Sequence, residues 1–483
     1  MKRSIQYFNY QLAEGAFILA MLSYIILRAV KIPVTHDEAG TILNYASRSI
    51  YSIITYEDPI PNNHLLNTLL IKFSISVLGL NEFACRLPNL IGGFMYLWFG
   101  IKISNLFSQK KIIQTCFLLL LVANPYLTEF FALARGYGLS IGFMMGSLYY
   151  YFSWQEGANK GIWAMILGAL GVYANLTLLN YFIPLCGIML VGWFQRPRDW
   201  RLLFSTVFII IVLMMALYLP ITKMIRTEQF VYWGSRGFYQ DTFVPLLNAS
   251  LMGKKYFGSA TAVVFTWFIF ILILIQSVAI GLSMFLTKPL RVIYFNSICI
   301  FFFAVLYNIL QNKLFNIPFL NARTALFFYP LLMMGSIGAL LYFHGIPWLR
   351  IVIKAIFTIL FIFSIVHIYR SYNLHSSYEW WFDGDNKRVV SIIGRDVITN
   401  HRSAPATLHC DWIFQPSLTF YTKGQANPYI VPPPYNKGID TVEVADYYYI
   451  TSDDMNDWIN EKYDTLSAFA WGSRLLMKKK SND

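Results

Sequence analysis

The 483-residue chain has few charged side chains. Asp, Glu, Lys and Arg make up 13% of it, about half the share usual in soluble globular proteins. Hydrophobic residues account for 57% of the chain and aromatic residues for 18%. Too little charge is present to cover a water-soluble protein of this size. The composition therefore indicates an integral membrane protein.

Cysteine is also scarce, with five residues and no CxxC spacing. This excludes an intramolecular disulfide framework and a cysteine metal site. Internal repeats and paired broken helices, which many secondary transporters carry, are absent from the sequence as well. The cysteines are scattered, four in or near apolar runs and one in the tail: Cys85, Cys116, Cys186, Cys299 and Cys410.

Long apolar runs are abundant, and eleven are near the length that crosses about 30 Å of hydrocarbon. We therefore predict an α-helical polytopic membrane protein with about eleven transmembrane helices in residues 1–369. No small-residue cleavage site follows the first run, so we expect it to be retained as the first span. The runs lie at approximately 12–33, 87–106, 112–127, 132–154, 162–177, 178–194, 201–221, 261–285, 291–311, 323–343 and 350–369.

Lys and Arg in the short loops predict the orientation of these spans. With eleven spans, all of the basic loops fall on one face, which is then cytoplasmic. Much of the net charge of +13 is this topology signal, so membrane lipids are expected partners and nucleic acid is not. The basic residues are Lys2, Arg3, Lys110, Lys111, Lys160, Arg196, Arg198, Arg201, Lys288, Arg291 and Arg350.

The same count places a long first loop, 34–86, and the tail, 370–483, outside the cytoplasm. Residues 64–80 contain Lys72 and follow the polar Pro61-Asn62-Asn63. We predict that they form an interfacial helix, because a span here would force the basic pair at 110–111 outside. A short true span is the alternative.

Composition changes after Tyr369 to charged and turn-rich sequence. Residues 404–410, 429–431 and 447–451 have the pattern of short strands, and helical stretches are expected near 385–399 and 452–461. The tail is therefore predicted to form a small extracytoplasmic α/β domain.

An acidic pair, Asp37 and Glu38, lies within a few residues of the end of the first apolar run. Charge near hydrocarbon costs several kcal/mol by rough estimate, so a carboxylate pair here caps a structure or performs chemistry. Singly, other polar residues on this face have structural explanations, such as an ion pair between Glu82 and Arg86 or headgroup anchoring. Together they predict an active site; the set is His36, Asp37, Glu38, Glu57, Asp58, His64, Glu82, Arg86, Glu129, Arg135 and Arg323.

Four stretches in this order resemble a known family. They are His36-Asp37-Glu38-Ala39 after the first run, His64 to Phe73 followed by Leu78 to Pro88, Asn124-Pro125-Tyr126 with Ala134 to Leu139, and Ala322-Arg323-Thr324 with Pro330. The family is that of the GT-C membrane glycosyltransferases, which use polyprenyl-phosphate-linked sugars and include protein O-mannosyltransferases and the aminoarabinose transferases of lipid A. The likeness is dense over residues 30–140 and thin elsewhere.

Two departures from the family pattern stand out. Leu65 and Leu66 replace two prolines, and Leu133 occupies a position where many relatives carry a Glu. The second departure leaves the second acidic residue of the site unidentified. Glu129, one helical turn earlier, is a candidate to replace it.

The resemblance implies an inverting glycosyltransferase that moves a sugar from a polyprenyl-phosphate carrier to a lipid, glycan or protein acceptor. Asp37 would be the catalytic base, with its pKa raised by partial dehydration, and Glu38 would support it. Arg323 and Arg135 are the candidates to hold the phosphate, because guanidinium offers bidentate donors. Arg86 is expected to hold the first loop, and the predicted substrate-binding set is His64, Arg86, Glu129, Arg135, Tyr137 and Arg323.

No cofactor is required by this pattern. A divalent cation is possible, because Asp37, Glu38, His36 and His64 are suitable ligand types, although no spacing demands one. The expected location is the inner (plasma) membrane, with the active site on the extracytoplasmic face. The alternative function is a multi-pass transporter or flippase of lipid-linked sugars. Residues 222–260 are predicted to form a lid over the site or, alternatively, a plain membrane-surface segment.

Overall fold

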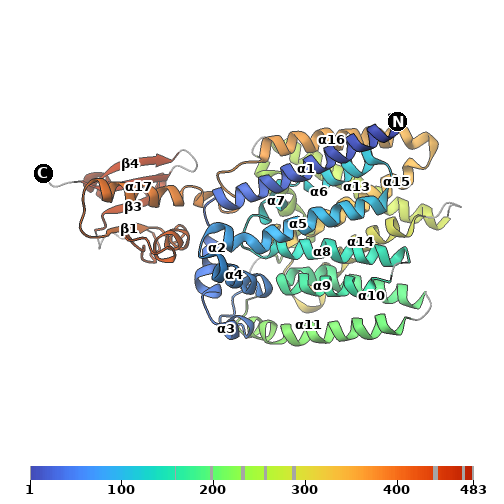
Figure 1. The fold of residues 1–483 in the computed structure, drawn as a ribbon, viewed down its shortest axis with the longest axis horizontal. Coiled ribbons are helices and arrows are strands. Elements are labelled where there is room, and N and C mark those ends of the chain that lie inside the picture. The colour runs from blue at the N-terminus through green and yellow to red at the C-terminus, as the bar shows by residue number, and fades with distance from the viewer. Residues whose placement is uncertain are drawn as a thin grey trace.

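The computed structural model describes residues 2–157, 159–195, 199–229, 234–254, 258–285, 290–438, 444–469 and 474–480, without the side chains of residues 2–13, 254, 259 and 261. A bundle of long helices forms one part of the molecule and a small β-sheet domain lies at one end of it (Figure 1). The N-terminus lies toward the opposite end of the bundle (Figure 1). Tyr232, Trp233, Lys255 and Tyr256 of the predicted lid lie outside the described residues.

Helices lie at all eleven of the apolar runs. The bundle consists of α1 (Lys2–Lys31), α5 (Glu82–Phe107), α6 (Lys111–Val122), α7 (Pro125–Phe130), α8 (Tyr137–Gln155), α9 (Gly161–Ala174), α10 (Leu179–Phe194), α11 (Trp200–Arg226), α12 (Val244–Ser250), α13 (Ser259–Phe285), α14 (Val292–Phe315), α15 (Phe328–His344) and α16 (Arg350–Ser371).

Six helices of the described chain are long and apolar enough to cross a membrane, and a seventh is added if the bent pair Glu14–Lys31 and His36–Ala46 counts as one span. Helices such as α6, α9 and α15 are apolar but only 12 to 17 residues long. A mostly helical, multi-pass membrane protein is therefore confirmed, and the number eleven stays a prediction.

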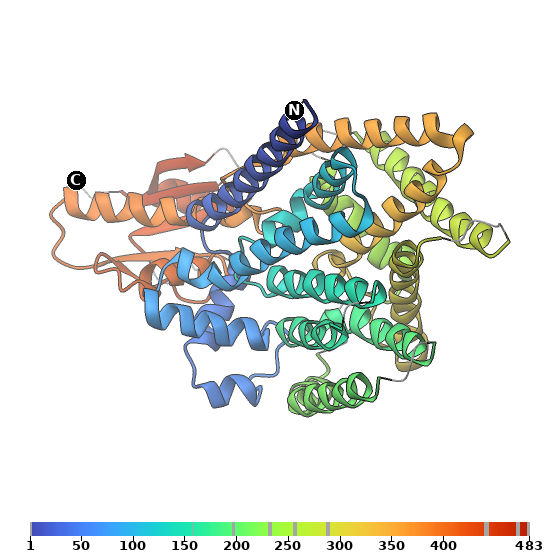
Figure 2. The same ribbon diagram turned by 45° about the vertical axis from the view of Figure 1, so that its right-hand side comes forward.

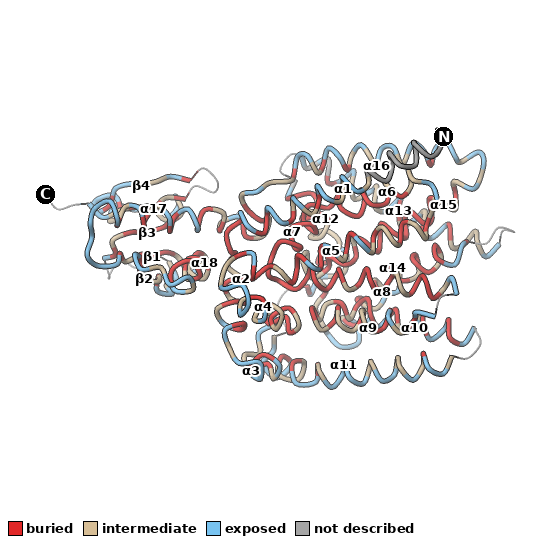
Figure 3. The backbone as a smooth tube through the Cα atoms, viewed as in Figure 1, coloured by how far each residue is buried: buried red, intermediate tan, exposed pale blue. Residues whose placement is uncertain are grey.

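The outer helices of the bundle expose apolar side chains. On α11, Phe204, Phe208 and Met214 are each about two-thirds exposed, and Trp267 of α13 is equally so. Exposed residues alternate with partly buried residues along α11 and α16 (Figure 3). Large apolar groups on a surface of this extent indicate contact with lipid rather than water.

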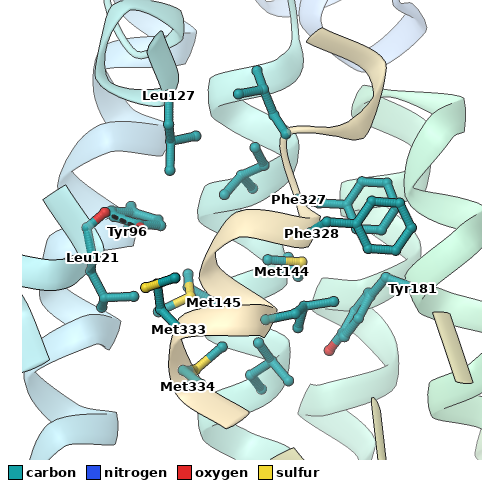
Figure 4. Close-up of a cluster of buried hydrophobic side chains, with 14 of the residues drawn as sticks. Tyr96, Leu121, Leu127, Met144, Met145, Tyr181, Phe327, Phe328, Met333 and Met334 are labelled. Atoms are coloured by element: carbon teal, nitrogen blue, oxygen red, sulfur yellow. Dashed lines mark hydrogen bonds between the residues drawn. The ribbon is translucent and has the colours of Figure 1, made fainter. Parts of the chain in front are cut away.

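The bundle interior is filled by aromatic residues, leucine and methionine, including Tyr96, Met144, Met145 and Phe328 (Figure 4). Helices α5 and α8 approach closely where Gly92 faces Gly142. A Cβ atom on Gly142 would lie 2.4 Å from the carbonyl oxygen of Gly92, so a side chain at this position would clash. The first turn of α8 is also tied to α5, since the Asn89 side chain accepts a 3.0 Å hydrogen bond from the Leu139 amide.

The loop after α1 folds into short helices at the end of the bundle next to the sheet domain (Figures 1 and 2). They are α2 (His36–Gly40), η1 (Thr41–Ala46), α3 (Ile50–Ile54) and α4 (Leu65–Leu78). α4 corresponds to the predicted interfacial helix. Its 14 residues extend about 21 Å, less than the hydrocarbon thickness. The loop and the tail therefore lie at the same end of the bundle, as expected if both are on the same side of the membrane.

The tail forms the predicted small domain. It contains α17 (Asn386–Thr399), α18 (Gln415–Thr419), α19 (Asp457–Lys462) and a sheet of β1 (Ala406–Cys410), β2 (Ile430–Val431), β3 (Tyr447–Thr451), β4 (Tyr463–Phe469) and β5 (Arg474–Lys479). The strand order is β2-β1-β3-β5-β4, with β1 parallel to β2 and β3 and the other pairs antiparallel. Three of these strands match the sequence prediction, whereas β4 and β5 were not expected.

A labelling experiment tests which face this domain occupies. Cys410 is only 2% exposed, so an engineered cysteine is needed. In a variant without native cysteines, we expect Ser403→Cys, at an exposed loop of the domain, to react with a membrane-impermeant maleimide on intact cells. Gln109→Cys, between α5 and α6, should react only after the cells are opened. The reverse pattern would contradict the predicted topology.

Candidate active site

The acidic pair begins a helix that follows the first span. Thr35 caps α2: its hydroxyl accepts from the Glu38 amide, and the Glu38 carboxylate accepts from the Thr35 amide at 2.9 Å. This capping box turns the chain by 71° relative to the end of α1. The turn places Asp37 and Glu38 at the end of the bundle, pointing in different directions.

Glu38 is fully buried and forms a two-point ion pair with Arg86. Arg86 Nη1 also donates to the Ala29 and Ile32 carbonyl oxygens, and Nη2 donates to that of Pro33, so the guanidinium closes the open end of α1. The other hydrogen bonds to Glu38 come from the amides of Ala134 and Thr35. These contacts support the expected loop-holding role of Arg86, and they place Glu38 in the same role.

Asp37 lies between two guanidinium groups. Arg135 Nη2 and Arg323 Nη2 are each 3.2 Å from Asp37 Oδ2, and the carboxylate side chain is 15% exposed. Burial would raise the pKa of Asp37, but the charges of Arg135 and Arg323 outweigh it and hold the pKa below its usual value. The expectation of a raised pKa was wrong, because the sequence did not show that both cations converge on this one carboxylate.

Arg135 lies behind Asp37 and is only 1% exposed. Its guanidinium donates to Thr41 Oγ1 at 3.1 Å, to the Asp37 carbonyl oxygen at 3.3 Å and to Asn62 Oδ1 at 2.9 Å. These contacts hold the first loop against the turn before α8. Of the two predicted phosphate-binding arginines, Arg135 is therefore the enclosed one.

Arg323 opens toward solvent, with 31% of its side chain exposed. It lies in η5 (Ala322–Ala325), which precedes α15, and its guanidinium carbon is 5.0 Å from the centre of the Trp380 ring. Nη1 forms an ion pair with Glu379, whose other carboxylate oxygen accepts from the Tyr126 hydroxyl. Arg323 thus faces the solvent-accessible side of the site and is shared by two carboxylates.

His64 and Tyr137 lie beside these charges. The two rings meet edge to face at 5.2 Å, and His64 Nε2 is buried without a hydrogen-bond partner among the described residues. Burial and then the charges of Arg135 and Arg323 hold the pKa of His64 well below its usual range, so the ring is neutral. Tyr137 also lines a pocket with Asn175 and Arg323, between α8 and η5.

Glu129 lies apart from this group and is 3% exposed. Its Oε1 pairs with Arg28 Nη2 at 2.9 Å, and its Oε2 accepts from the Tyr378 amide at the same distance. With both oxygens engaged inside the protein, Glu129 links α1, α7 and the segment after α16. Its contacts offer no support for the suggested role as the second acidic residue.

The four side chains considered as metal ligands do not converge. Glu38 is occupied by Arg86, and His36 Nδ1 is 3.0 Å from the Ile413 carbonyl oxygen. Within the described chain, no group of three or more His, Cys, Asp or Glu side chains is arranged to hold an ion. We therefore assign no step of the chemistry to a metal.

Sequence reasoning missed Glu379, Trp380 and Asp383, which follow the last span. The Trp380 ring lies 5.0 Å from the guanidinium carbon of Arg323, and Asp383 Oδ2 accepts from the His36 amide at 2.7 Å. The signal that singled out Asp37, an acidic residue close to the end of an apolar run, also applies to Glu379. Applied to both ends of the span region, it would have found this residue.

Solved structures with a similar fold exist. The chain matches the crystal structure of ArnT from Cupriavidus metallidurans in the apo state with a TM-score of 0.52, at 11% identity over 98% of each chain. It matches the structure of the same protein bound to undecaprenyl phosphate with a TM-score of 0.51, at the same identity and coverage. No protein-family model and no curated protein matches the chain. The resemblance predicted from the sequence is thus confirmed at the level of the fold.

Proposed function

We propose that the protein is a membrane glycosyltransferase that takes a sugar from a polyprenyl-phosphate carrier. The observation that carries this proposal is the pairing of a partly exposed guanidinium, Arg323, with the Asp37 carboxylate 3.2 Å away. A transfer of this kind needs positive charge at the leaving phosphate and a base at the attacking group. Both are present at the end of a helix bundle whose fold is shared with a protein solved with undecaprenyl phosphate bound.

In the proposed reaction, Arg323 binds the phosphate and Asp37 accepts the proton of the acceptor hydroxyl. The acceptor oxygen bonds to the anomeric carbon as the bond from that carbon to the phosphate oxygen breaks. The polyprenyl phosphate leaves with the electron pair, and this single displacement inverts the anomeric centre. A bound phosphate also draws Arg323 away from Asp37, which raises the pKa of Asp37 toward the range useful for a base.

Apolar side chains of the bundle lie next to Arg323. Beside Arg323, a pocket is lined by Ile141 of α8 and by Leu326 and Phe327, which follow η5. The cavity holds about 10 Å³, which marks apolar surroundings beside Arg323 and is too small to be a channel for the tail itself. A lipid-linked donor fits such a site, because its tail stays in the membrane while its sugar phosphate reaches the bundle end.

The remaining assignments follow from this proposal. Glu38, Arg86 and Arg135 are positioning residues that hold the Asp37 loop, and His64 and Tyr137 border the substrate. The site faces the extracytoplasmic side of an inner membrane, where the acceptor is a lipid, glycan or protein. A flippase is the competing function. The ion-paired Asp37 favours the transferase, because moving a lipid across the bilayer does not need a base at this position.

Donor binding by Arg323 variants tests the proposal. We expect Arg323→Ala to weaken binding of a polyprenyl-phosphate sugar about ten- to a hundred-fold, the range that a charged hydrogen bond is worth. Arg323→Lys should recover only part of the affinity, because the bidentate geometry is lost. Titration of the detergent-purified protein measures this directly.

The control is Arg48→Ala, which removes a 40% exposed guanidinium of the first loop that is paired with Asp58 at 3.7 Å. It should bind the donor as the wild type does. Unchanged binding in Arg323→Ala, with the protein still folded, would mean that the phosphate is held elsewhere.

A further inference from the structure

The segment between α16 and α17, residues 372–385, crosses the candidate site; we call it the strap. It is anchored in the bundle by Arg28, which donates to the carbonyl oxygens of Asn373 at 2.6 Å and Ser376 at 3.2 Å. The Tyr378 amide donates to Glu129 Oε2 at 2.9 Å. Because Arg28 and Glu129 are themselves a buried ion pair, this part of the strap is firmly held.

Beyond that anchor, two consecutive strap residues meet the phosphate-binding arginine. Glu379 pairs with Arg323 Nη1, and the Trp380 ring lies 5.0 Å below the guanidinium carbon. The Glu379 side chain is 20% exposed, so its carboxylate is on the accessible side of Arg323. The Tyr126 hydroxyl donates to its second oxygen and holds it in this position.

Formal charges in the site balance before a donor binds. Arg135 and Arg323 contribute two positive charges, and Asp37 and Glu379 contribute two negative ones. A sugar phosphodiester adds one negative charge. The released polyprenyl phosphate, a monoester, carries about −1.5 to −2 near neutral pH, as other phosphate monoesters do. The extra charge on the product strengthens its attraction to Arg135 and Arg323, and the Glu379 carboxylate cancels part of that added attraction.

We propose that Glu379 is a positioning residue that competes with the phosphate for Arg323 and promotes release of the polyprenyl-phosphate product. When the phosphate is bound, Glu379 gives up Nη1 of Arg323 and keeps its contact with Tyr126. When the sugar has left, the carboxylate returns to Arg323 and takes over a contact that would otherwise retain the monoester. This inference rests on the proposed function, and it connects turnover to the domain that follows the last span.

Glu379→Gln tests this role. The variant keeps the shape of the side chain and removes its charge. We expect it to bind a short-chain polyprenyl phosphate about tenfold more tightly than the wild type. This factor corresponds to the lower end of the contribution of one hydrogen bond to a charged group. Product inhibition should rise by a similar factor and kcat should fall. A residue that only supports the fold would not raise affinity while lowering kcat.

Two further variants accompany it. Tyr126→Phe removes a hydroxyl that contacts Glu379 with and without the phosphate and leaves the charge unchanged, so product affinity should change much less than in Glu379→Gln. Glu461→Gln, at an exposed position of α19 in the same domain, makes the same charge change away from the site and should bind the product as the wild type does.

The outcomes separate this inference from the proposed function. If Arg323→Ala binds the short-chain polyprenyl phosphate as tightly as the wild type, the phosphate site itself is wrong. If Arg323→Ala loses binding but Glu379→Gln binds it no more tightly than the wild type, the phosphate site stands and the competing role of Glu379 is overturned. Calorimetric titration of each purified variant, together with inhibition of turnover by the same compound, gives both answers.

Discussion

Asp37→Asn should remove most turnover while donor binding survives. The amide keeps the shape of the side chain and leaves an oxygen for Arg135 and Arg323, but it cannot take the acceptor's proton. Loss of a general base costs about 100- to 10,000-fold in rate. Donor affinity should be unchanged or slightly higher, because one carboxylate that competes for Arg323 has been neutralised. Steady-state turnover and equilibrium donor binding are measured on the same preparation.

Asp58→Asn is the matched control: Asp58 was predicted in the site from the sequence, but the structure pairs it with Arg48 rather than with the arginines beside Asp37, and it lies in the same loop. It should turn over at the wild-type rate. If Asp37→Asn loses donor affinity as strongly as Arg323→Ala does, Asp37 binds the donor rather than activating the acceptor. The assignment of Asp37 as general base would then be given up.

Glu38→Gln should destabilise the protein strongly. The substitution leaves the Arg86 guanidinium fully buried without its counter-ion, and breaking a buried ion pair from one side costs about 3–5 kcal/mol. The loop that carries Asp37 also loses the hydrogen bonds that Glu38 accepts from the Ala134 and Thr35 amides. Thermal unfolding in detergent should show a much lower transition temperature, and activity should fall with the folded fraction.

The exposed pair of Arg48 and Asp58 supplies the comparison for this second prediction. Exposed ion pairs contribute about 0–1 kcal/mol, so Asp58→Asn should leave the transition nearly unchanged. A fully stable Glu38→Gln protein with low activity would show that Glu38 acts in the chemistry rather than in holding the loop.

Local sequence patterns predicted the parts of the fold that depend on neighbouring residues. Apolar runs located the helices, and the helix at Leu65–Leu78 was expected to lie outside the bilayer because a span there would place the basic pair at 110–111 on the wrong face. The strands Tyr463–Phe469 and Arg474–Lys479 were missed, and only the first of them lies at an edge of the sheet. Neither strand shows a clear alternation of apolar and polar residues in the sequence. In the first strand only the two end residues are buried, and charged side chains occur in both strands.

The sequence indicated several residues of the candidate site but not the contacts between them. Asp37, Arg135 and Arg323 were identified as residue types suited to the chemistry, and the structure brings all three together. The lowered pKa of Asp37 could not be foreseen, because it depends on two cations from distant parts of the chain. The position of Glu379 after the last apolar run could have marked it as a candidate, but its contact with Arg323 exists only after the strap crosses the end of the bundle.

Sugar transfer by the purified protein in detergent tests the central claim most directly, because detergent removes the two compartments that a transporter needs. Labelled lipid-linked sugars and an envelope extract, both from cells lacking the protein, serve as donor pool and acceptor. We expect the wild type to move label from the lipid carrier to the extract and to release polyprenyl phosphate, and we expect Asp37→Asn to do neither. If the folded wild type moves no label, or if Asp37→Asn moves as much as the wild type, the protein is not the transferase proposed here.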